Sequence, residues 1–179
     1  MHCGAVYVPL DNQLPDDRLL YQLQDAKADW VLCHARDAER FAAVEGVLAI
    51  DEVLVAAYPN KPLARDIRAS DALYMVYTSG STGLPKASII SNASFASLIQ
   101  WYVTEYAFSE NDKCLVYSSI GFDLSQKNLF ALLTVGGTVV LLDQKVFEPK
   151  AVVDAIATHG ITYLNSAPSA FYPLLLNKD

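Results

Sequence analysis

The 179-residue sequence is poor in cysteine, in positive charge and in long apolar runs, and each shortage excludes a class of protein. Its three cysteines, Cys3, Cys33 and Cys114, lie far apart without metal-ligand spacing and cannot all pair. Buried free thiols in a reducing compartment are therefore expected. The net charge of −7 argues against nucleic acid binding. No apolar run is long enough to span a bilayer and no signal peptide pattern opens the chain, so we expect a cytoplasmic protein that does not bind membranes.

The residues that are present predict one domain with a substantial core. Hydrophobic residues make up 53% of the chain and charged residues 18%, which is a globular composition. Short apolar runs alternate with stretches in which apolar residues recur at helical spacing, and this order predicts βαβ units. We therefore expect an α/β fold with a mainly parallel sheet and helices on both of its faces.

The expected strands and helices follow one another along the whole chain. Strands or extended pieces are expected at residues 4–10, 28–35, 47–53, 72–80, 86–91, 113–119, 138–143 and 161–168. Helices are expected at residues 16–26, 93–106, 123–137, 148–160 and 169–176, the second of them N-capped by Ser91 or Asn92. The polar residues 58–72 are expected to form a surface connection. The chain begins inside a strand and stops just after a helix begins, which indicates a piece of a longer protein.

The stretch YTSGSTGLPK, residues 77–86, combines hydroxyls, two glycines and a lysine after an expected strand. Backbone N–H groups, hydroxyls and a cation are the donors that a phosphate group needs, and glycine lets the backbone approach closely. Leu84 and Pro85 separate the second glycine from the lysine, so this is not the Walker pattern, and no third glycine makes it a dinucleotide fingerprint. The alternative is an ordinary Ser/Gly-rich hairpin loop.

The order of these residues resembles the phosphate-binding loop of the adenylate-forming enzymes, which include acyl-CoA ligases, luciferases and the adenylation domains of nonribosomal peptide synthetases. Two further segments, GAVYVPLD at residues 4–11 and FDLSQKNLFALLTVGGTVVLLD at residues 122–143, resemble the amino-acid-activating adenylation domains in particular. The resemblance covers the whole chain. It implies that residues 1–179 form a single, partial AMP-binding (adenylation) subdomain, with the flavodoxin-like architecture of the family's large N-terminal part.

The resemblance also implies a role for individual residues. The catalytic pair would be Lys86 and Thr78, and the β- and γ-phosphates of ATP would be held by Thr78, Ser79, Gly80, Ser81, Thr82, Gly83 and Lys86. Asp123 would pair with the α-ammonium group of an amino acid. Phe122 would pack beside it, and the pocket for the substrate side chain would include Leu124, Lys127 and Asn165.

Alternatives remain for two of these residues, and the sequence departs from the family at two others. Asp123 suits an ordinary helix N-cap as well as an ammonium partner. Lys127 suits a solvated helix face; if it lines the pocket, it should favour a polar or acidic substrate side chain. Ala87 stands where the family usually has glycine after the loop lysine, and Asn92 where a histidine is common. These departures concern the geometry around the phosphates.

The implied activity is ATP-dependent formation of an aminoacyl-adenylate, which is then loaded onto the phosphopantetheine thiol of a carrier protein. The implied partners are an amino acid, ATP with Mg, and the carrier and condensation domains of a synthetase. In the family, the Mg-binding Glu motif, the adenine and ribose contacts and the lid lysine lie further along the chain than Asp179. No metal ligand is therefore expected in residues 1–179, and the isolated chain is expected to be inactive.

Two other functions and one physical consequence remain open. The chain could be a catalytically silent nucleotide-binding or scaffold module, or a relative of the acyl-CoA ligases. Asp123 argues against the second of these, because a carboxylate suits an ammonium group and not a fatty chain. If a missing part covers one face of the sheet, the isolated chain should expose an apolar patch and self-associate through it.

Overall fold

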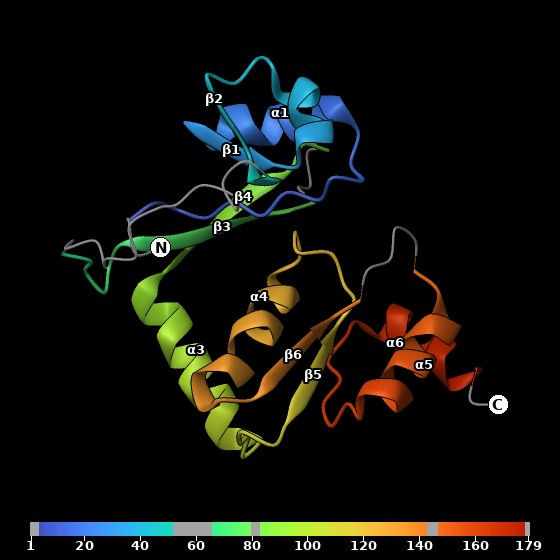
Figure 1. Ribbon diagram of the computed structural model, residues 1–179. Coiled ribbons are helices and arrows are strands. Elements are labelled where there is room, and N and C mark those ends of the chain that lie inside the picture. Colours follow the sequence, from blue (N-terminus) through green and yellow to red (C-terminus); the bar gives the residue numbers. More distant parts are fainter. Residues whose placement is uncertain (1–3, 52–65, 80–82, 143–146, 178–179) are drawn as a thin grey trace.

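The computed structural model describes residues 4–51, 66–79, 83–142 and 147–177, and within these ranges the chain is an α/β protein with three pairs of strands (Figure 1). The strands are β1 (Trp30–Cys33), β2 (Gly46–Ala49), β3 (Ala72–Thr78), β4 (Lys86–Ser91), β5 (Lys113–Val116) and β6 (Thr138–Leu141). The α-helices are α1 (Asp16–Asp25), α3 (Asn92–Glu105), α4 (Asp123–Phe130), α5 (Pro149–His159) and α6 (Pro168–Leu175). Two 3₁₀ helices are η1 (Ala35–Phe41) and η2 (Leu132–Val135).

The strand pairing confirms the α/β class and shows one antiparallel pair. β1 pairs with β2 and β5 with β6 in parallel, each pair joined by a crossover that contains helical structure. β3 and β4 are antiparallel, because the connection between them is too short for the crossover that parallel strands require. Tyr7 adds a parallel bridge to Tyr74 of β3, and Tyr163 adds one to Cys114 of β5. The strand expected at 161–168 is reduced to that single bridge.

Helices lie on both faces of the β5–β6 pair, as the nearly continuous apolar strands predicted (Figure 1). Leu115 packs on one face in a cluster with Val152 and Ala155 of α5 and Leu174 of α6. Its neighbours Cys114 and Val116 pack on the opposite face with Leu132 of η2. On that face a further cluster joins Ile99 and Tyr102 of α3 to Ala131, at the end of α4. The alternation of side chains along one strand thus builds two cores.

The cysteine prediction is confirmed for the two cysteines that the structure describes. Cys33 and Cys114 are buried free thiols, and burial raises the pKa of Cys114 to about 11. Such a thiol stays protonated at neutral pH and is a poor nucleophile. Cys3 lies outside the described residues.

Local sequence signals set several helix boundaries. The Ser91 side chain accepts a hydrogen bond from the backbone N–H of Ser94 at 3.2 Å, so Ser91 is the N-cap of α3. α5 ends at Gly160, whose φ of 62° is the left-handed conformation that glycine adopts most readily. The helix expected at 123–137 is instead two elements, α4 and the 3₁₀ helix η2. The second ends before Gly136, where φ is 82°. Helix η1 was not predicted.

Large apolar side chains are exposed on several strands. Leu32 of β1 is 64% exposed, although β1 also places Val31 and Cys33 in the core, and Ile89 of β4 is 61% exposed. None of the helices in the described ranges is long and apolar enough to cross a lipid bilayer. These exposed strand faces are candidate association surfaces.

We predict that the isolated chain self-associates as its concentration rises. Sedimentation velocity should show a sedimentation coefficient that increases with concentration, because association buries exposed apolar surface. The double variant Leu32→Lys/Ile89→Lys should reduce this increase, since lysine at these exposed positions adds charge without entering the core. A compact monomer at all concentrations would contradict the prediction.

Candidate functional site

The β3–β4 hairpin presents the predicted phosphate loop. Thr78 ends β3 and Lys86 begins β4; the two residues are opposite each other in the strand register, and the Thr78 hydroxyl donates to the Lys86 carbonyl at 3.4 Å. We call Thr78 and Lys86 the neck of the 79–85 loop. Both neck residues and Ser79 are exposed and accessible to a ligand. The hairpin geometry and the phosphate prediction are therefore compatible with each other.

Gly83 is the loop glycine that the structure describes. Its φ is 86°, and a β-carbon added there would meet no atom within 4 Å. Glycine is therefore favoured at this position by the backbone conformation and not by crowding. Gly80, Ser81 and Thr82, which belong to the predicted phosphate site, lie outside the described residues.

Asp123 lies at the start of α4, just beyond the end of β5. The N-cap residue of α4 is Phe122, not Asp123, and no side chain caps this helix, so the simple capping interpretation of Asp123 is wrong. The Asp123 carboxylate is exposed and accepts a hydrogen bond from the backbone N–H of Leu124 at 2.6 Å. Within the described part of the chain, no Lys, Arg or His nitrogen lies within 4.0 Å of it. The carboxylate can therefore accept an external cation.

The buried side of α4 is polar, and its side chains hold the loop that carries Phe122 and Asp123. Ser125 and Gln126 are fully buried. The Ser125 hydroxyl donates to the Ser119 carbonyl at 2.7 Å, and the Gln126 amide donates to the Ile120 carbonyl at 2.7 Å. The sequence analysis did not single out these residues. The signal that could have revealed them is a run of polar residues where an amphipathic helix should turn an apolar face to the core.

Asn165 joins α4 through a reciprocal pair of hydrogen bonds. The Asn128 amide donates to the Asn165 backbone carbonyl at 3.0 Å, and the Asn165 amide donates to the Asn128 side-chain oxygen at 3.0 Å. Asn128 is 1% exposed and Asn165 is half-buried. The structure thus brings Asn165 to the helix that carries Asp123, Leu124 and Lys127. Asn128 is a second residue that the sequence analysis missed.

Lys127 is turned toward α3. Its ammonium nitrogen lies 5.1 Å from the centre of the Tyr102 ring, which is a cation–π distance, and the side chain is half-buried. The Tyr102 hydroxyl is in turn hydrogen-bonded to the Tyr163 hydroxyl. Lys127 is therefore not a freely solvated lysine in this structure. Leu124, the remaining predicted pocket residue, is half-buried.

Three segments that are far apart in the sequence converge beside β3. Tyr7 of the first motif pairs with Tyr74, whose strand leads directly into the 79–85 loop. A β-carbon at Gly121 would lie 3.9 Å from the Asp11 backbone nitrogen, so the first motif also meets the loop before Asp123. Burial, and after it the charge of Asp123, raises the pKa of Tyr74. All three motifs that the sequence analysis quoted therefore belong to one region.

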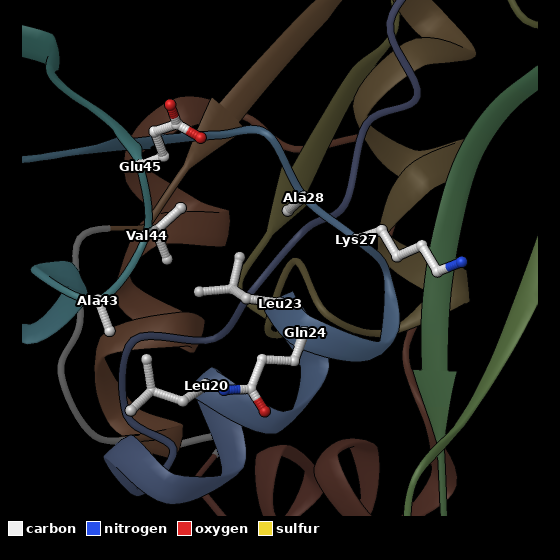
Figure 2. Close-up of a pocket in the computed structure, with 8 residues that line it drawn as sticks. All are labelled: Leu20, Leu23, Gln24, Lys27, Ala28, Ala43, Val44 and Glu45. Carbon is white, nitrogen blue, oxygen red and sulfur yellow. The ribbon is translucent and has the colours of Figure 1, made fainter.

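Two hollows in the described surface lie apart from these residues. One, of about 180 Å³, lies between α1 and the segment before β2, and Figure 2 shows the charged groups of Lys27 and Glu45 pointing away from it. The other, of about 580 Å³, runs along α3 and is lined mainly by apolar side chains such as Phe95, Ile99 and Phe130. Neither has the convergent polar groups of a substrate site. In the described ranges no group of three His, Cys, Asp or Glu residues could hold a metal ion.

A loop whose sequence is rich in Ser, Thr and Gly, with a lysine at its neck, offers the donors that a phosphate group needs. Over residues 1–179 the chain matches the family described as AMP-binding enzyme, and it belongs to that family. This confirms the predicted membership of the adenylate-forming enzymes.

Curated relatives include subunits of peptide synthetases. The chain is 30% identical over 177 residues to surfactin synthase subunit 2 of Bacillus subtilis (strain 168), covering 98% of the chain and 5% of that protein. It is 30% identical over 191 residues to the L-proline--[L-prolyl-carrier protein] ligase of Pseudomonas fluorescens, covering 100% of the chain and 38% of the ligase. The chain thus spans only a small part of the relatives that it matches.

Solved structures share the fold. The nonribosomal peptide synthetase FmoA3 superposes with a TM-score of 0.85 at 26% identity, covering 98% of the chain and 19% of that protein. The o-succinylbenzoate CoA synthetase of Bacillus subtilis, in complex with an acyl-adenylate intermediate, superposes with a TM-score of 0.82 at 21% identity, covering 96% of the chain and 45% of that protein. At this lower identity the second likeness shows the fold alone.

Proposed function

We propose that this chain is part of a cytoplasmic amino-acid-activating adenylation domain. In the proposed reaction, a carboxylate oxygen of the amino acid attacks the α-phosphorus of ATP. The bond from that phosphorus to the bridging oxygen breaks, and pyrophosphate leaves with its electron pair. The phosphopantetheine thiol of a carrier domain then attacks the aminoacyl carbonyl and displaces AMP. Carrier and condensation domains of a synthetase are the proposed partners.

The observation that carries this proposal is the exposed carboxylate of Asp123 at the start of α4, which forms no ion pair with the described residues. A carboxylate that has no cation within 4.0 Å among the described residues favours a ligand that brings an ammonium group. The relatives agree with this choice: one is named as a ligase of L-proline and its carrier protein, and FmoA3 has been solved in an α-methyl-L-serine-AMP bound form. An acyl-CoA ligase has no need for a carboxylate at this position.

The residues fit the phosphate groups better than they fit a metal ion. Thr78, Ser79 and Gly83 offer hydroxyl and backbone donors, and Lys86 offers a positive charge at the neck. The described residues provide no cluster of metal ligands, so we propose that Mg enters with ATP and is held by parts of a longer protein. The half-buried Lys127, Leu124 and Asn165 are proposed to line the pocket for the amino acid side chain, with Lys127 favouring a polar or acidic one.

The first test is a calorimetric titration of this chain with Mg-ATP. Saturable binding is expected, and Lys86→Ala should weaken it about 10-fold to 150-fold, because one charge-assisted hydrogen bond contributes about 1.5–3 kcal/mol. Lys150→Ala is the matched control, since Lys150 is exposed on α5 and pairs with Asp154 there. The absence of binding heat with the unaltered chain would instead indicate a scaffold or folding unit.

A further inference from the structure

Tyr77 ties the end of β3 to helix α1. It stands directly before the neck residue Thr78, and its hydroxyl lies 2.8 Å from a carboxylate oxygen of Asp25 and 3.0 Å from the Gln22 carbonyl. Both oxygens are acceptors that share the single hydroxyl proton of Tyr77, and both residues belong to α1. Burial, and after it the hydrogen bond to Asp25, raises the pKa of Tyr77 well above its ordinary value. The hydroxyl therefore stays protonated and remains a donor.

Tyr21 ties the other side of the neck to the same helix. Its hydroxyl donates to the Pro85 carbonyl at 3.4 Å, across 64 positions of the sequence. Pro85 is buried, although its neighbours Leu84 and Lys86 are exposed. The carbonyl that Tyr21 holds belongs to the peptide group that joins Pro85 to Lys86. The proline ring also fixes φ at the residue before the lysine.

Helix α1 is itself firmly held. Leu19 is 1% exposed and Leu23 is 5% exposed, and both pack in a core cluster with Val31 and Cys33 of β1. The two hydroxyls therefore connect the neck to a rigid support and not to a mobile surface helix. Their positions are matched: Tyr77 directly precedes Thr78, and Tyr21 holds Pro85, which directly precedes Lys86.

We propose that α1 fixes the neck of the 79–85 loop through the hydroxyls of Tyr77 and Tyr21, so that Thr78 and Lys86 are in place before a nucleotide arrives. The two tyrosines are positioning residues and need not touch the nucleotide. The expected effect on ATP affinity rests on the proposed function. The claim that α1 fixes the neck does not depend on that function. A neck that is fixed in advance lowers the entropy that phosphate binding must otherwise offset.

The test uses Tyr77→Phe, Tyr21→Phe and the double variant, which remove the hydroxyls and keep the rings. Amide hydrogen exchange in the ligand-free chain should become about 2-fold to 12-fold faster at Thr78, Lys86 and Ala87 for each lost hydroxyl, the range expected for one hydrogen bond. Exchange in β5 and β6 should not change. Tyr172→Phe is the matched control, because Tyr172 is 66% exposed on α6.

The second readout is the affinity of the same variants for Mg-ATP. Tyr77→Phe and Tyr21→Phe should each bind it several-fold more weakly than the unaltered chain, whereas Tyr172→Phe should not. Variants that melt at a lower temperature but keep both neck exchange and ATP affinity unchanged would overturn the proposal, because the tyrosines would then only hold α1. If the unaltered chain binds no Mg-ATP, the proposed function fails, and exchange at the neck still decides whether α1 holds it.

Discussion

Replacing Asp123 by alanine is expected to lower aminoacyl-adenylate formation at least about 30-fold in a protein that contains residues 1–179. Loss of one partner of a desolvated ion pair costs about 2–5 kcal/mol, which corresponds to roughly 30-fold to 4,000-fold. The physical reason is that no cation of the described chain lies within 4.0 Å of this carboxylate, so its proposed partner is the substrate ammonium. Amino-acid-dependent exchange of labelled pyrophosphate into ATP measures the loss as kcat/KM for the amino acid.

A second variant separates the charge from the fold at this position. Asp123→Asn keeps the size of the side chain and should lose nearly as much activity, whereas KM for ATP should stay close to its original value in both variants. Asp154→Ala is the control, since this exposed carboxylate pairs with Lys150 on α5 and exposed ion pairs contribute little. Unchanged kcat/KM for the amino acid in Asp123→Ala would exclude the ammonium role. A gain of activity toward acyl acids that lack an amino group would fit that role.

Replacing Asn128 by alanine is expected to lower the free energy of unfolding by about 2–4 kcal/mol, because it removes both hydrogen bonds of the reciprocal pair in a buried position. Asn128 is 1% exposed, so the half-buried Asn165 would lose a buried partner for both its side-chain amide and its backbone carbonyl. Urea denaturation measures the effect as a lower midpoint at an unchanged slope.

Replacing the other residue of the pair, Asn165, should have a different effect on stability, and the difference tests the geometry. Asn165→Ala should cost less than Asn128→Ala, because the backbone carbonyl of residue 165 remains and can still accept from Asn128. Asn177→Ala, which removes an exposed hydrogen bond to the Pro173 carbonyl, should change stability by no more than about 0.5 kcal/mol. Equal losses for Asn128→Ala and Asn177→Ala would show that the buried pair contributes nothing beyond a surface hydrogen bond.

The local elements were predictable because each depends on residues that are close together in the sequence. The apolar spacing of Leu19 and Leu23 predicted α1, and both are buried there. Ser91 capped α3 as expected, and Gly160 ended α5. By contrast, the lengths of strands depend on distant partners. In the described chain, the expected strand 161–168 keeps only the isolated bridge from Tyr163 to Cys114 of β5.

The sequence by itself determined the chemistry of this protein: the α/β class, the loop with its hydroxyls, glycines and lysine, and an acidic residue that follows an apolar strand. Only the tertiary structure decided how these groups are supported. Polar residues such as Gln126 and Asn128 can be buried because loop carbonyls from Ile120 and Asn165 are brought to them. Tyr77 and Tyr21 likewise gain a role only where α1 meets the hairpin. Hydrogen bonds between residues far apart in the chain depend on the packed fold, and no local pattern encodes them.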